Sequence, residues 1–150
     1  HWVLREGGAV SGLCFGGNLA CLNLLTGTDF WPTFLLSSSR VILFIEWCAE
    51  AAEGLDLNMF NAALHSLLLT LENSGNCTVA GLLFGRFERT CKIGRQELES
   101  VVSTLSEVGL IGDIPVIANC DFGHTCPIRT FPIVGEAVIE PGGQITLTKY

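Results

Sequence analysis

The chain has 150 residues, a length that fits one domain with a sizeable hydrophobic core. Its formal net charge of -7 opposes a nucleic-acid partner, because binding to phosphates depends on lysine and arginine. Although 49% of the residues are hydrophobic and only 15% are charged, no apolar run approaches the roughly 18 residues that cross a bilayer. We therefore expect no membrane span, and we infer an apolar surface that meets another domain or subunit.

The N-terminal part predicts one short helix and a loop. Gly16 and Gly17 precede Asn18, a favourable N-cap residue, and residues 19–25 then predict a helix. Free backbone N–H groups at the start of this helix could hold a carboxylate or an oxyanion. Alternatively, the two glycines only allow a tight turn. Residues 28–39 predict a loop.

The middle of the chain predicts two buried strands with a helix between them. Residues 41–45 are an apolar run that ends at Glu46 and predicts the first strand, and residues 79–84 predict the second. Between them, apolar residues recur at helical spacing from about residue 56 to residue 73, which predicts a helix with one buried face.

The C-terminal part predicts a helix over residues 96–108 and a short strand over residues 116–118. Three more strands, at residues 130–134, 137–139 and 144–147, predict a β meander whose last two strands form a hairpin. The predicted fold class is therefore α/β, with a mixed sheet, flanking helices and a C-terminal β meander. No linker divides the chain, so a single domain is expected over its whole length.

Two polar residues follow predicted strands, Glu46 and His124. Carboxyl ends of strands are where open α/β sheets place their sites, so these side chains can meet. A carboxylate beside an imidazole orients the ring and stabilises the imidazolium, which is the supporting half of a nucleophile-histidine-acid triad. Alternatively, Glu46 is a solvated strand end and His124 bonds to a loop carbonyl. No activated serine is evident in the chain.

Four segments together carry a family resemblance. They are Gly-Gly-Asn-Leu, Ile-Leu-Phe-Ile-Glu, Gly-Leu-Leu-Phe-Gly-Arg-Phe and Phe-Gly-His-Thr-Cys-Pro, the last followed by Thr-Phe-Pro-Ile. In this order they resemble the C-terminal domain of the LD-carboxypeptidase and microcin C immunity (MccF-like) family of serine peptidases. The resemblance covers nearly the whole chain and implies a mixed α/β fold of the swivelling type.

In that family the triad is Ser-Glu-His, with the serine in an N-terminal domain. The resemblance implies that Glu46 orients the ring, that His124 is the general base, and that Gly16, Gly17 and Asn18 contact substrate. The chain would be the C-terminal half of a two-domain carboxypeptidase-type hydrolase, inactive without its N-terminal nucleophile domain and needing no cofactor. The implied substrates are muropeptides with an LD-peptide bond or aminoacyl and peptidyl nucleotide conjugates. Relatives are commonly homodimers.

Departures from the family pattern concern substrate preference. Trp47 stands where relatives commonly carry an acidic or small residue, and the helix over residues 56–73 lacks an arginine often found there. Trp47 could contact substrate, contact another subunit or pack into the core, and core packing is the leading interpretation.

Charged residues near the candidate site have structural interpretations. Arg86, Arg89, Lys92 and Arg95 fall in one predicted loop, where they could attract an anionic group or simply be solvated. Asp121 could orient His124, although a loop-capping role is favoured.

The chain contains seven cysteines without a regular spacing, which predicts reduced, mostly buried thiols and a cytoplasmic protein. Zinc bound by Cys120, His124 and Cys126, or a Cys120 nucleophile, is a weaker alternative, since there is no Cys-x-x-Cys pair. No metal is therefore expected. Because the chain begins at His1, we expect a longer parent protein, whose signal peptide, if any, lies upstream. The competing functional hypothesis is a non-catalytic binding or assembly domain.

Overall fold

The computed structural model describes residues 1–37, 39–48, 57–74 and 77–149. Within these residues one sheet has seven strands in the order β1-β5-β4-β3-β2-β6-β7. The strands are β1 (Trp2–Arg5), β2 (Val10–Asn18), β3 (Arg40–Glu46), β4 (Thr78–Gly85), β5 (Val116–Cys120), β6 (Glu136–Ile139) and β7 (Ile145–Lys149). The helices are α1 (Leu19–Leu25), α2 (Thr33–Leu36), α3 (Leu57–Asn73) and α4 (Arg95–Glu107), with a 3₁₀ turn, η2 (Arg89–Cys91). The predicted α/β class with a mixed sheet is confirmed.

The centre of the sheet is parallel and its edges are antiparallel. Strands β2, β3, β4 and β5 pair in parallel, while β1 adds to β5 and the β6–β7 hairpin adds to β2 in antiparallel fashion. The carboxyl ends of the four parallel strands therefore meet at one edge of the sheet. In this register Asn18 lies opposite Glu46, and Gly85 lies opposite Cys120.

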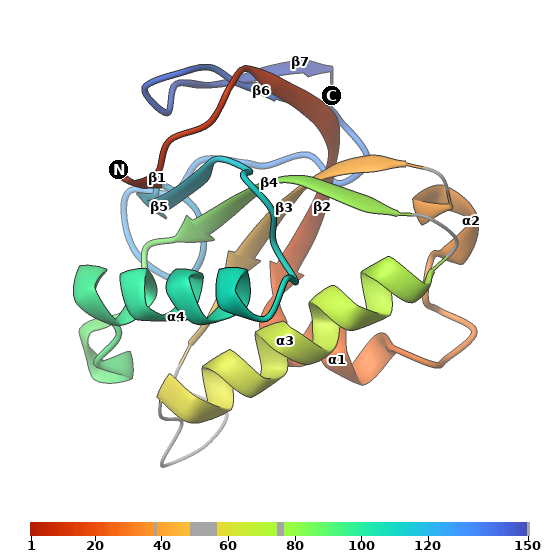
Figure 1. Cartoon of the computed structure of the whole chain (residues 1–150), viewed down its shortest axis with the longest axis horizontal. Helices are drawn as coiled ribbons and strands as arrows, with labels where there is room; N and C mark the ends of the chain where they lie inside the picture. The colour runs from red at the N-terminus through yellow and green to blue at the C-terminus, as the bar shows by residue number, and fades with distance from the viewer. Residues whose placement is uncertain (38, 49–56, 75–76, 150) are drawn as a thin grey trace.

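Helices α1, α3 and α4 cover one face of the sheet, below it in the view of Figure 1. Their buried residues recur at helical spacing, including Phe60, Leu64 and Leu71 on α3 and Leu98 and Leu105 on α4. We call the cluster that they form with the sheet the helix-covered core. The helices predicted at residues 19–25 and 96–108 are confirmed within one residue at each end. Helix α3 ends at the predicted residue, but its predicted start lies outside the described residues.

The opposite face carries a smaller core under the β6–β7 hairpin and the loop of residues 121–135. In Figure 1 the hairpin lies at the top, on the far side of the sheet from the helices. Ile42, Phe44 and Ile117 of the central strands pack here with Phe122 of the loop and Ile139 of β6. We call this cluster the loop-covered core. Alternate residues of a strand point to opposite faces, so one strand serves both cores.

Strands β1 and β2 are not predicted from the sequence, and one predicted strand is not formed in the described residues. Gly16 and Gly17 are not a turn but the end of β2, with φ of 155° and 145°. Residues 28–39 contain the single helical turn α2. The strand predicted at residues 130–134 is wrong, because Pro132 has no N–H to donate and Val134 has a left-handed φ of 66°. Only the β6–β7 part of the meander is confirmed.

Among the described residues, the structure holds no helix with both the length and the apolar character that crossing a bilayer requires.

Candidate active site

Glu46 and His124, which are 78 residues apart in the sequence, meet in the structure. Nδ1 of His124 lies 3.0 Å from Oε2 of Glu46. The side chain of Glu46 is 19% exposed and that of His124 is 44% exposed, so the acid is shielded while the imidazole reaches the surface. A ring that carries its proton on Nδ1 donates it to the carboxylate, which leaves Nε2 to accept a proton from another group.

Glu46 owes its position to the period of β3. Ile42 and Phe44 face the loop-covered core, whereas Leu43 and Ile45 face the helix-covered core. The alternation along a strand then directs Glu46 to the face that the His124 loop covers. Strands β2 and β4 pair with β3 on both sides, so the backbone that carries the carboxylate is fixed by the sheet.

The residues just before His124 place it against Glu46. The ring of Phe122 packs edge-on to Phe44, with centroids 5.7 Å apart, and also contacts Phe131 at 5.3 Å. Gly123 has a φ of 105°, and a Cβ there would lie 3.1 Å from Oε2 of Glu46. A residue with a side chain would therefore be strained and would crowd the carboxylate. The Phe-Gly-His segment acts as one unit that brings the imidazole to the acid.

The predicted substrate-contact residues lie beside this pair, across the β2–β3 register. A Cβ on Gly16 would lie 1.8 Å from the carbonyl oxygen of Phe44, so the close approach of the two strands requires glycine. Gly17 faces open space. The Asn18 side chain accepts a hydrogen bond from the Cys21 N–H at 3.2 Å, which confirms the predicted N-cap of α1. Substrate contact by these three residues stays a prediction.

Trp47 lies in the helix-covered core. It is 4% exposed, and its ring packs edge-on against Phe60 with centroids 5.5 Å apart. Its indole N–H is buried and has no hydrogen-bond partner among the described residues. This burial favours the core-packing interpretation over stacking on a substrate group, and a role in substrate binding stays a prediction.

The family model of the LD-carboxypeptidase C-terminal domain matches residues 11–139. The chain belongs to this family. The resemblance inferred from the four sequence segments is therefore confirmed.

Relatives of this LD-carboxypeptidase C-terminal domain are longer proteins. The "Putative carboxypeptidase YocD" of Bacillus subtilis (strain 168) is 37% identical over 138 residues, which are 92% of this chain and 38% of that protein. An MccF-like protein from Bacillus anthracis str. Ames superimposes with a TM-score of 0.80 at 31% identity, covering 99% of this chain and 42% of that one. A muramoyltetrapeptide carboxypeptidase from Oxalobacter formigenes superimposes with a TM-score of 0.66 at 28% identity, and the match covers 97% of this chain and 47% of that one. The chain thus spans less than half the length of these relatives.

Two of the basic residues that follow β4 in this LD-carboxypeptidase C-terminal domain are paired with carboxylates. Arg86 forms an ion pair with Asp121, whereas Arg95 pairs with Glu99 on α4 at 2.8 Å. The Asp121 carboxylate also lies 3.9 Å from Nε of the exposed Arg129, so it is engaged by two arginines rather than by His124. The pairing of Arg86 with Asp121 is not predicted from the sequence, although Arg86 follows β4 directly and so lies at the same edge of the sheet as Glu46.

The Cys120 thiol, four residues before His124, does not resemble an activated nucleophile. Burial raises the pKa of the Cys120 thiol to about 12, and the neighbouring Asp121 adds to the rise. A thiol with such a pKa stays protonated at neutral pH and is a poor nucleophile, which opposes the Cys120 alternative. Within the described ranges, no three His, Cys, Asp or Glu residues are grouped closely enough to hold a metal ion.

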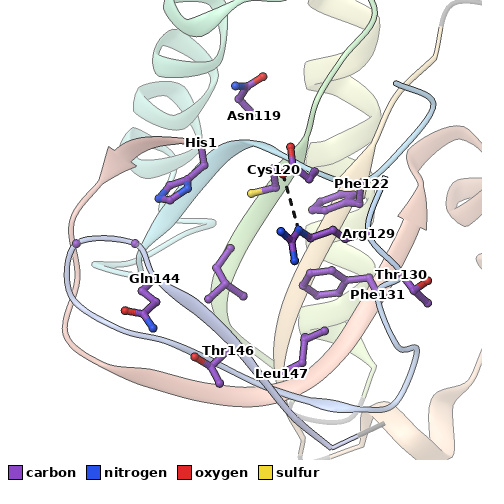
Figure 2. A pocket seen from close by; sticks show the side chains of 14 residues that line it. His1, Asn119, Cys120, Phe122, Arg129, Thr130, Phe131, Gln144, Thr146 and Leu147 are labelled. Carbon is purple, nitrogen blue, oxygen red and sulfur yellow. Dashed lines mark ion pairs between the residues drawn. The ribbon is translucent and has the colours of Figure 1, made fainter. Parts of the chain in front are cut away.

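A cavity of about 800 Å³ lies between the end of β5 and the β6–β7 hairpin. In Figure 2, Phe122, Arg129 and Phe131 lie on one side of it, and His1 and Gln144 lie on the other. Asp121 and Phe122 of the His124 loop line this cavity, but neither Glu46 nor His124 does.

Proposed function

We propose that this domain supplies the glutamate and the histidine of a Ser-Glu-His triad to a carboxypeptidase-type amide hydrolase, whose serine lies on a second, N-terminal domain. The contact of 3.0 Å between Glu46 Oε2 and His124 Nδ1, at the carboxyl edge of the sheet, carries this proposal. Membership in the LD-carboxypeptidase family supports it.

In the proposed reaction His124 moves the protons. Its Nε2 takes the proton of the serine hydroxyl while the serine oxygen attacks the amide carbonyl carbon. The C–N bond then breaks, and the same nitrogen gives the proton to the leaving amine. Water, deprotonated in turn by His124, then attacks the acyl-enzyme ester. The bond between the acyl carbon and the serine oxygen breaks, His124 returns the proton to that oxygen, and the carboxylic acid product leaves.

Glu46 keeps the imidazole ready for both steps. Its hydrogen bond holds the ring in the tautomer with the proton on Nδ1, and its charge stabilises the imidazolium. The shielding of the carboxylate strengthens this effect, because charges attract each other more strongly where water is partly excluded.

The proposed substrates are muropeptides with an LD-peptide bond and aminoacyl nucleotide conjugates. Gly17 and Asn18 support substrate contact at this edge, because Gly17 has open space beside its backbone and Asn18 lies opposite Glu46. A substrate main chain can approach closely where no side chain intervenes.

The test uses the full-length protein with both substrates. We expect Glu46→Gln and His124→Gln each to lower kcat about 10³- to 10⁴-fold, as loss of one triad member does, with a small change in KM. His65→Gln is the matched control, because His65 is exposed on α3, away from the pair. The isolated 150-residue chain should hydrolyse neither substrate.

Two outcomes would contradict the proposal. One is turnover by the isolated chain that survives Glu46→Gln. The other is a full-length protein that binds a substrate but does not turn it over, which would favour the non-catalytic binding domain.

A further inference from the structure

We propose that Arg86 is a positioning residue, which fastens the loop that carries His124 so that the imidazole stays against Glu46. This inference rests on the proposed function. Among the described residues, the hydrogen bonds of the Arg86 side chain go to Asp121 and Cys126, and none goes to Glu46 or His124.

The guanidinium of Arg86 joins two points of the loop on either side of His124. One terminal nitrogen, Nη1, donates a hydrogen bond to the carbonyl oxygen of Cys126 at 2.9 Å. The other, Nη2, donates to the Asp121 carboxylate and forms an ion pair with it. The planar fork of the guanidinium group can donate to two separate acceptors at once through its two terminal nitrogens. The single ammonium nitrogen of a lysine would not reach both acceptors in this geometry.

The main chain of Arg86 adds two more contacts to the same loop. Its N–H donates to the carbonyl oxygen of Phe122 at 3.3 Å, and its own carbonyl oxygen accepts a hydrogen bond from the Thr125 hydroxyl at 3.3 Å. One residue thus bonds to the loop at Asp121, Phe122, Thr125 and Cys126. We call these four contacts the Arg86 clamp.

The clamp ties the base to the part of the sheet that carries the acid. Arg86 directly follows β4, and β4 pairs with β3 up to the Phe84–Ile45 register, one residue before Glu46. His124 is 44% exposed, so packing around the ring alone does not hold it. The ion pair is partly shielded, with Arg86 28% and Asp121 34% exposed, which makes it stronger than a fully solvated pair.

The experiment compares variants of the full-length protein by steady-state kinetics and by proton NMR. The NMR readout is the far-downfield resonance of an imidazole Nδ1–H that hydrogen-bonds to a carboxylate, assigned by its loss in His124→Gln. Arg86→Gln keeps the main-chain contacts but removes both guanidinium bonds. We expect it to lower kcat about 10- to 100-fold, with KM changed less than about threefold, because a small misplacement of a catalytic group costs this much. The resonance should broaden or disappear.

Two further variants sharpen the result. Arg86→Lys keeps the charge beside Asp121 but loses the fork, so it should recover only part of kcat. Arg89→Gln is the matched control, because this arginine lies three positions further on, is exposed, and makes no side-chain contact with the loop in the described structure. It should behave as the wild type.

An Arg86→Gln protein with unchanged kcat and an unchanged resonance would overturn the inference. If that variant does not fold, Asp121→Asn, which weakens the carboxylate end of the clamp, decides by the same two readouts. Failure of the proposed function itself looks different: Glu46→Gln and His124→Gln would then retain turnover. The resonance would still report on Arg86 in that case, because it needs no substrate.

Discussion

The acid and the base of the candidate site are held by two different kinds of structure. Glu46 is the last residue of the central strand β3, which is paired on both sides. The residue before it, Ile45, is fully buried. His124 lies in an irregular loop, held by the Arg86 clamp and by the packing of Phe122. The sheet therefore fixes the acid, whereas a few individual side chains fix the base. Substitutions that disturb the sheet around Glu46 should unfold the domain. Substitutions that disturb the contacts of the His124 loop should lower activity while the domain stays folded.

The largest effect is expected on the side of the acid, at Gly16. The variant Gly16→Ala places a methyl group 1.8 Å from the Phe44 carbonyl oxygen at a φ of 155°. We expect a loss of about 4 kcal/mol in the free energy of unfolding, the sum of backbone strain and overpacking. Gly17→Ala is the matched control with strain but open space, and it should cost about 1 kcal/mol. Denaturant unfolding measures both, and equal losses would contradict the close β2–β3 approach.

The next effect should come from the side of the base, at Phe122. Phe122→Ala opens the loop-covered core and should cost about 3 kcal/mol, the lower end for a buried phenylalanine. Leu105→Ala in the helix-covered core should cost a similar amount. At temperatures where both variants are folded, kcat of the full-length protein should fall in Phe122→Ala and stay unchanged in Leu105→Ala. A parallel fall in both would remove the distinction between the two regions.

A smaller loss of stability is expected at Gly123, where the two regions touch. Gly123→Ala adds strain at a φ of 105° and crowds the Glu46 carboxylate, so it should cost about 1 to 2 kcal/mol. Its effect on kcat should be larger, about tenfold or more, because the crowding falls on the Glu46–His124 contact itself. Gly142→Ala in the β6–β7 turn has comparable strain but open space and should leave kcat unchanged. The prediction fails if the two variants match in kcat.

The smallest effect is a loss of stability in alkali that comes from the loop-covered core. Burial raises the pKa of Cys14 from 9.0 to about 11 and that of Cys120 to about 12. Below pH 9 both states keep these protons. Above pH 9 the thiols of the unfolded chain lose their protons before those of the folded domain, because their pKa is lower in the unfolded chain. The free energy of unfolding therefore falls as the pH rises from 9 toward 12. Cys120→Ala should make this fall shallower, whereas Cys21→Ala, at an exposed position, should not. Unfolding midpoints across this pH range measure the difference.

The same contrast explains what the sequence reveals. The spacing of apolar residues and the glycines and polar residues between them predict helices α1 and α4 and strands β3 and β4. The same pattern predicts that Glu46 lies at the end of a strand. Strand β2 is not predicted because its three glycines and its polar residues hide the alternation of a strand. The Arg86 clamp has no local signal, since its partners lie 35 to 40 residues away. For His124, its place in a glycine-containing loop after a strand, together with the family resemblance, predicts a role in the site.

The order of the strands has one more consequence for how the pair is assembled. Strands β3 and β5 are not neighbours, because β4 lies between them. At about 4.8 Å per strand, their ends are roughly 10 Å apart. His124 lies four residues beyond the end of β5, and the chain that leaves β5 passes over the tip of β4, where the Arg86 N–H donates to the Phe122 carbonyl oxygen. Gly85 leaves room for that crossing, since a Cβ there would lie 2.7 Å from the Phe122 carbonyl oxygen. Strand β4, which carries neither Glu46 nor His124, thus supports the loop that brings them together.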